Sequence, residues 1–208
     1  MKKISVLIAI IALSYGCAVK TARIDSSLNI DTAVTAAKEN TPNLCSYRGR
    51  ISVTINAERA VSFSGLLNKK CNDDALINIL GAMNSPIAKI TYQDKKVSVE
   101  TPSKEDTKEI QRLADNYVFH IVNFFKTPLD IPDTESYSLS FASDAYIFSR
   151  GISDKIFADE NFRLFKYISG HIKTEYVWSG DFLKEISVSS DNGAVSVKFL
   201  NKNGWSDK

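Results

Sequence analysis

The chain has 208 residues, of which 44% are hydrophobic and 24% are charged, with 26 Lys and Arg against 24 Asp and Glu. These values are close to the averages for soluble globular proteins, so they exclude an intrinsically disordered chain, a collagen-like repeat and a protein with several membrane spans.

The first seventeen residues differ from the rest of the chain. They begin with Lys2 and Lys3, continue through the apolar run 4–13, and reach Gly16 just before Cys17. This layout is typical of a secretory signal peptide, and it is too short to span a bilayer as a mature helix. Removal of residues 1–16 takes away two positive charges, so the formal net charge falls from +2 to 0. A neutral chain has no electrostatic basis for binding nucleic acid.

Cys17 follows the apolar run and a small residue, as the acylated Cys of a bacterial lipoprotein does. Ser14 and Tyr15 depart from the residues usual before such a Cys, so an ordinary signal peptide with a chance Cys stays open as the alternative. Ala18 and Val19 follow, and the lack of Asp there favours the outer membrane under the common enterobacterial sorting rule. We therefore expect lipid attachment at Cys17 and anchoring in the outer membrane, facing the periplasm. Such an anchor needs more than one acyl chain, since each buried methylene contributes roughly 0.8 kcal/mol.

Two further cysteines, Cys45 and Cys71, flank a predicted β-hairpin. Residues 48–56 and 60–68 both alternate between apolar and polar, and a turn centred on Glu58 pairs residues whose numbers sum to 116. In this register Cys45 lies opposite Cys71, and directly opposed residues are close enough for a disulfide. We predict that bridge, which would contribute roughly 3–4 kcal/mol in the loop-entropy model. Two buried free thiols are the alternative.

The remaining pattern predicts one domain after a tether. Residues 17–44 form the lipidated N-terminus and a small, polar tether with a short helix capped by Asp31, and the domain occupies 45–208. A capping box of Ser103 and Asp106 opens an amphipathic helix of about 22 residues, which Pro128 stops. Period-two alternation predicts about eleven strands, at 48–56, 60–68, 74–80, 86–93, 96–101, 137–141, 145–149, 162–168, 171–178, 182–189 and 194–200. The expected fold is mainly β with one long helix: a curved, mostly antiparallel sheet with the helix against its concave side.

The sequence lacks the usual signatures of catalysis and of metal binding. It contains no Gly-x-Ser-x-Gly, no glycine-rich phosphate loop and no His-Glu-x-x-His. His120 and His171 have no Cys, Asp or Glu at metal-ligand spacing, and the acidic pairs 73–74 and 105–106 are explained by solubility and helix capping. We therefore expect no enzyme, no metal site and no cofactor.

A curved sheet that does not close leaves an interior lined by alternate side chains, and the mouth of such a sheet is a common site for apolar ligands. Periodicity does not distinguish an apolar cavity from a filled core, so both interpretations stay open. The candidates for the lining are apolar residues of the strands and the helix: Val53, Ile55, Phe63, Ile77, Ile79, Ile90, Val97, Val99, Leu113, Tyr117 and Ile121.

Several segments together resemble LolB, the outer-membrane receptor that accepts lipoproteins from the periplasmic carrier LolA. They are residues 75–101 with the helix that follows, the C-terminal block 185–205, Gly49-Arg50-Ile51 in the first strand, and 62–65 in the second. The similarity covers roughly residues 48–205 and lies in the order and spacing of these segments.

The resemblance implies an incomplete, half-open antiparallel β-barrel with a helical lid and an apolar cavity for acyl chains. It also implies a LolA-like carrier and acylated lipoprotein cargo as partners of a monomer, and insertion of the cargo into the outer membrane. The family carries an exposed apolar side chain, usually Leu, on the loop between its third and fourth strands, and Met83 occupies that position here. An envelope lipoprotein that binds or shuttles lipid without inserting cargo, or one with a structural role, is the alternative.

Overall fold

The computed structural model describes residues 24–41, 45–56, 60–72, 74–123, 134–142, 144–191 and 193–206. The described helices are α2 (Ile30–Asn40) and α3 (Lys104–Asn123), with short 3-10 turns η1 (Ala82–Asn84), η2 (Thr134–Ser136) and η3 (Lys202–Gly204). The strands are β1 (Ser46–Asn56), β2 (Ala60–Lys69), β3 (Ala75–Leu80), β4 (Pro86–Gln93), β5 (Lys96–Glu100), β6 (Ser138–Phe141), β7 (Tyr146–Arg150), β8 (Asp154–Ala158), β9 (Leu164–Ser169), β10 (Ile172–Ser179), β11 (Phe182–Ser190), β12 (Gly193–Phe199) and β13 (Trp205–Ser206).

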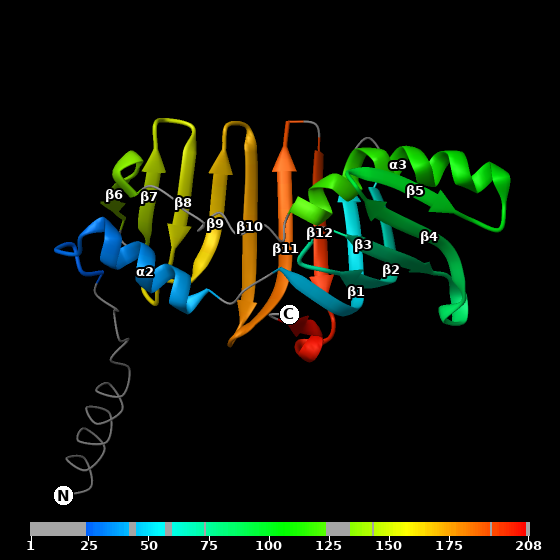
Figure 1. Ribbon diagram of the computed structural model, residues 1–208, viewed down its shortest axis with the longest axis horizontal. Helices are drawn as coiled ribbons and strands as arrows, with labels where there is room; N and C mark the ends of the chain where they lie inside the picture. Colours follow the sequence, from blue (N-terminus) through cyan, green and yellow to red (C-terminus); the bar gives the residue numbers. More distant parts are fainter. Residues whose placement is uncertain are drawn as a thin grey trace, which may run out of the picture.

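Twelve of these strands form one antiparallel sheet in the order β5-β4-β3-β2-β1-β12-β11-β10-β9-β8-β7-β6, and β13 pairs with β1 beside this path. In Figure 1 the two halves of the chain lie next to each other along the sheet, joined where β1 pairs with β12. The ends of the path are β5 and β6, so the sheet is open rather than closed into a barrel. The predicted mainly β, antiparallel architecture is confirmed in this form.

The first hairpin has the predicted register. Ile55 pairs with Val61, Val53 with Phe63 and Ile51 with Gly65, so the paired numbers sum to 116 along the whole of β1 and β2. The register follows from the alternation, because a slip by one residue would turn every apolar side chain of one strand to the solvent face.

Two strands of the sheet were not predicted, the two-residue β13 and the longer β8. Asp154–Ala158 forms β8 between β7 and β9, and its Ile156 and Ala158 are buried. Only these two of its five residues follow the alternation of a strand with one buried face. Asp154 and Lys155 weaken that alternation in the sequence. The burial of this strand depends on its neighbours more than on its own composition.

Helix α3 begins directly after Ser103, as predicted, and spans 20 residues. The amide of Thr107 donates to the carbonyl of Ser103 (3.3 Å), while the side chain of Asp106 and the predicted continuation beyond Asn123 lie outside the described residues. Ala114 and Val118 of α3 are buried. Among the described helices, none combines the length and the apolarity that a membrane span requires.

A second helix, α2, lies in the segment that was predicted to be a tether. Its cap is Asn29, whose Oδ1 accepts from the Thr32 amide (2.9 Å), and the predicted cap Asp31 stands in the first turn instead. Asn, like Asp, is a preferred capping residue, so the pattern allowed either position. The helix buries Ala33, Val34 and Ala37 against the core.

Hydrogen bonds tie both ends of this segment to the sheet. The amide of Asp25 donates to the hydroxyl of Tyr146 on β7 (3.1 Å), and the amide of Leu164 on β9 donates to Oγ1 of Thr41 (3.2 Å). Residues 24–41 therefore pack on the sheet, although the predicted domain begins only at residue 45. The predicted signal peptide 1–16 and Cys17 lie outside the described residues.

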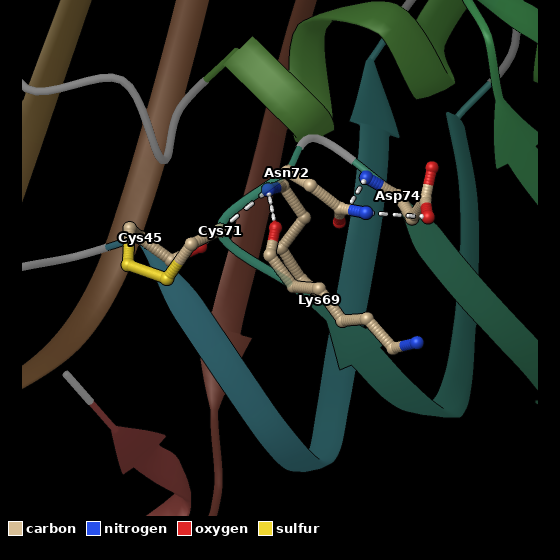
Figure 2. The surroundings of a disulfide bond; sticks show 6 residues. Cys45, Lys69, Cys71, Asn72 and Asp74 are labelled. Carbon is tan, nitrogen blue, oxygen red and sulfur yellow. Dashed lines mark hydrogen bonds between the residues drawn. A yellow bond between two sulfur atoms is a disulfide. The ribbon is translucent and has the colours of Figure 1, made fainter. Parts of the chain in front are cut away.

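A disulfide joins Cys45 to Cys71, with 4.6 Å between their Cα atoms. Figure 2 shows it at the start of β1, beside the turn that leads from β2 to β3, where Asn72 and Asp74 share hydrogen bonds. Lys69 lies next to it with only 2% of its surface exposed, and its Nζ donates to the carbonyl of Cys45 (3.4 Å). The bridge therefore closes the open end of the first hairpin.

Two tyrosines contribute to the core with raised pKa values. Burial raises the pKa of Tyr176 on β10 well above its usual range, and burial also raises the pKa of Tyr47 on β1. Tyr47 packs edge-on against Phe199, with 4.8 Å between ring centroids. In both cases the folded chain favours the neutral phenol.

We expect Cys71→Ser to lower the free energy of unfolding by about 3 kcal/mol. Without the disulfide, the loop between residues 26 positions apart is no longer closed in the unfolded chain, which therefore gains conformational entropy. Urea denaturation with and without reductant measures this change. A Cys45→Ser/Cys71→Ser double variant serves as the control, since reductant should leave its stability unchanged. Equal stability of the oxidised parent and the double variant would contradict the prediction.

We expect stability to fall as the pH rises above 10, since unfolding lets Tyr176 ionise while folding keeps it protonated. Each such group changes the free energy of unfolding by up to about 1.4 kcal/mol per pH unit. Tyr176→Phe should make this alkaline decline shallower in denaturation curves recorded at successive pH values. Parallel declines in the two proteins would reject the assignment.

Candidate functional site

An apolar cavity of about 150 Å³ lies between α3 and the neighbouring face of β1–β4. All of its lining side chains are hydrocarbon: Ile55, Val61, Phe63, Ile77, Ile79, Ile90, Ile110, Leu113, Ala114 and Val118. We call this space the apolar cavity. The strands supply its floor through alternate residues, and α3 supplies its cover through residues three or four apart.

Most of the predicted lining residues reach this cavity, and the others fall into two groups. Ile55, Phe63, Ile77, Ile79, Ile90 and Leu113 line it. Val53 is fully buried in the adjoining core, and Val97 and Val99 of β5 pack against that core without lining the cavity. The side chains of Tyr117 and Ile121 lie outside the described residues.

Four lining residues were absent from the predicted set. Val61 lies on the same face of β2 as Phe63, and Ile110, Ala114 and Val118 follow one another at intervals of four along α3. The alternation along the strand and the apolar stripe along the helix were therefore sufficient to indicate these four residues as candidates. The choice of residues within the stripe depended on how the helix is rotated against the sheet, which the sequence pattern leaves open.

Among the side chains of α3 that the structure describes, Gln111 forms a hydrogen bond to the sheet. Its Nε2 donates to the carbonyl of Val97 on β5 (3.5 Å). In the first turn of the helix, the hydroxyl of Thr107 shares a hydrogen bond with the hydroxyl of Thr101 (2.6 Å). The rest of the described interface consists of apolar side chains such as Ala114 and Val118. Apolar contacts are non-directional, so they restrict the position of the helix less than a network of hydrogen bonds would.

The chemistry available in the apolar cavity is the burial of hydrocarbon. None of its lining side chains titrates or donates a hydrogen bond, and among the described residues no three His, Cys, Asp or Glu side chains are grouped for a metal ion. A dry apolar cavity of about this volume accommodates a molecule the size of benzene. The space therefore fits the end of an alkyl chain but not a whole long chain.

The loop between β3 and β4 presents Met83 to the solvent. Its side chain is 99% exposed, and the neighbouring Ile87 on β4 is also exposed. An exposed Met contributes nothing to the core, and its flexible thioether suits an irregular apolar partner.

The backbone of this loop is held in a defined shape. The amide of Gly81 donates to the carbonyl of Ser85 (2.8 Å), and Nη2 of Arg50 on β1 donates to Oδ1 of Asn84 (2.8 Å). Met83 and Asn84 both have left-handed backbone angles, with φ of 56° and 60°. A non-glycine residue adopts this conformation at an energetic cost, so the surrounding bonds hold the Met side chain outward.

No protein-family profile matches the chain, and no curated protein is significantly similar to it. Its backbone is similar to that of several solved structures. A LolA superfamily protein from Nitrosomonas europaea has a TM-score of 0.42 and 10% identity, over 84% of this chain and 92% of that one. An outer membrane lipoprotein-sorting protein domain from Vibrio parahaemolyticus has a TM-score of 0.42 and 9% identity, over 86% of this chain and 96% of that one. A DUF1329 family protein from Desulfovibrio piger has a TM-score of 0.42 and 11% identity, over 86% of this chain and 95% of that one.

Proposed function

We propose that the protein binds acyl chains in the apolar cavity, receives acylated lipoproteins there from a periplasmic carrier, and helps to insert them into the outer membrane. The observation that carries the proposal is the cavity itself: ten hydrocarbon side chains face an unfilled space between a helix and a sheet. A filled core, the other interpretation of the same residues, would leave no such space.

A protein site for acyl chains has a clear energetic purpose. Each methylene exposed to water costs roughly 0.8 kcal/mol, so a sixteen-carbon chain costs on the order of 12 kcal/mol. A chain that passes from one apolar site to another and then into a bilayer avoids this cost. The transfer runs downhill in free energy and needs no nucleotide.

A long chain needs more room than about 150 Å³. On this proposal, cargo enters as α3 moves away from β1–β4, and the small space marks where the chain end begins to insert. The described residues of α3 that face the cavity make apolar contacts, which are non-directional and allow such a movement. The helix then acts as the lid of the site.

Met83 supplies the contact with the bilayer in this scheme. Its loop is fixed at Gly81 and Asn84, so the exposed thioether projects from a rigid base. Burial of one apolar side chain in a membrane surface is worth only a few kcal/mol, which favours brief contact over permanent anchoring. Cys17 would provide the permanent anchor.

Val61→Phe should weaken fatty-acid binding at least tenfold, because the larger ring occupies the apolar cavity. Native mass spectrometry and displacement of a fluorescent fatty acid from the purified protein measure the binding. Val177→Phe is the matched control, since Val177 is exposed on β10 and does not line the cavity. If the parent protein binds no fatty acid, or if both variants bind as it does, acyl binding in this cavity is refuted.

Met83→Glu should leave folding and fatty-acid binding unchanged and slow the insertion of cargo, since a carboxylate is poorly accommodated among acyl chains. Reconstitution with a carrier–lipoprotein complex and liposomes measures insertion. Ile152→Glu is the matched control, because Ile152 is 95% exposed on the turn between β7 and β8.

The outcome of this reconstitution separates the candidate functions. Slower insertion with Met83→Glu alone supports the assigned role. Unchanged insertion rejects the role of Met83. Fatty-acid binding by the parent protein without any transfer from the carrier would instead identify a lipid-binding protein that lacks insertion activity.

A further inference from the structure

A second hollow, of about 350 Å³, lies at the ends of two central strands, between the β10–β11 turn and the C-terminal segment. Three aromatic side chains line it: Trp178, Phe182 and Trp205. Trp178 and Trp205 are the two tryptophans of the whole chain. We call this space the tryptophan hollow. It shares no lining residue with the apolar cavity.

Existing contacts hold its aromatic walls in place. Nε1 of Trp178 donates to the carbonyl of Leu164 (2.6 Å), and the guanidinium of Arg163 lies 5.4 Å from the centroid of the Trp178 ring. Trp205 packs edge-on against Tyr47, with 5.0 Å between ring centroids. Rings that are already positioned lose little conformational entropy when a ligand arrives.

The rim of the hollow is polar. Asp181, Lys202 and Asn203 line it, and the side chain of Asp181 is 95% exposed. Arg163 fixes the adjacent turn, since Nη1 donates to the carbonyl of Gly180 (2.6 Å) and Nη2 to Oδ1 of Asp181 (2.8 Å). The rim therefore offers both hydrogen-bond donors and acceptors in a fixed arrangement.

These groups discriminate between classes of ligand. A purely apolar ligand would remove water from Asp181 and Lys202 without replacing their hydrogen bonds, which is unfavourable. A cation would be attracted by the rings and by Asp181 but opposed by the positive charges of Arg163 and Lys202. A neutral ligand with one apolar face and several hydroxyl groups satisfies both the walls and the rim.

We propose that the tryptophan hollow binds a saccharide of hexose rings whose substituents are equatorial. Such a ring directs axial C–H bonds to its two faces, which pack against aromatic rings, and directs hydroxyl groups outward to polar partners. The volume lies within the range of small-ligand pockets, most of which combine aromatic walls with a few placed polar groups. The protein thus carries a glycan site in addition to the apolar cavity, and the two sites function independently.

The two tryptophans make the site directly observable. Titration of the full-length protein with cellotriose and with the N-acetylglucosamine trisaccharide, up to about 10 mM, covers the affinity expected for a ligand of this size. We expect a saturable change in tryptophan emission with at least one of them. Asp181→Ala should weaken that binding at least tenfold without altering the unfolding transition, because its side chain is exposed.

Asp191→Ala provides the matched control. Asp191 is an exposed acid on the β11–β12 turn, at the opposite end of β11 from Asp181. The Asp191→Ala variant should therefore bind saccharide as the parent protein does. The proposal is overturned by an absence of response to both trisaccharides, by equal weakening in the two variants, or by a saturable response to tetramethylammonium alone. That last result would identify a cation site instead.

Discussion

The structure depends on one constraint: an open sheet of twelve strands has an apolar face that must be kept from water. With neighbouring strands about 4.8 Å apart, such a sheet is roughly 50 Å wide. The described helices that cross it are α2 over the β7–β9 end and α3 over the β1–β5 end (Figure 1). At 1.5 Å per residue they are only about 16 Å and 30 Å long. The apolar cavity lies beneath α3, and the tryptophan hollow lies beside η3.

The two hollows differ because their covers differ. Under α3, helix and strand both present hydrocarbon, and the space between them excludes polar ligands. At the β10–β11 turn the cover is a short 3-10 turn with Lys202 and Asn203, which leaves aromatic rings beside charged groups. One continuous sheet thus carries one purely apolar environment and one that combines aromatic rings with charged groups. The division follows from which segment packs on each part of the sheet.

Sequence reasoning was strongest where one local pattern determined the answer. The register of Ile51, Val53 and Ile55 against β2, and with it the Cys45–Cys71 bridge, followed from alternation alone. It was weaker where burial depends on distant partners. Ala33 and Ala37 are too small to mark a core helix, yet the sheet buries them completely. Whether Ile90 faces a filled core or a cavity depends on the position of α3, which no local pattern encodes.

The attachment of residues 24–41 to β7 and β9 sets the reach of any N-terminal anchor. Ile24 follows Cys17 by seven residues, which span at most about 24 Å when fully extended. A tether that ran from Cys17 to residue 45 would instead span up to nearly 100 Å. Eight strand positions, or roughly 38 Å, separate β7 from the β3 end that carries the Met83 loop. A molecule anchored through Cys17 would therefore have to lie lengthwise along the bilayer for Met83 to touch it.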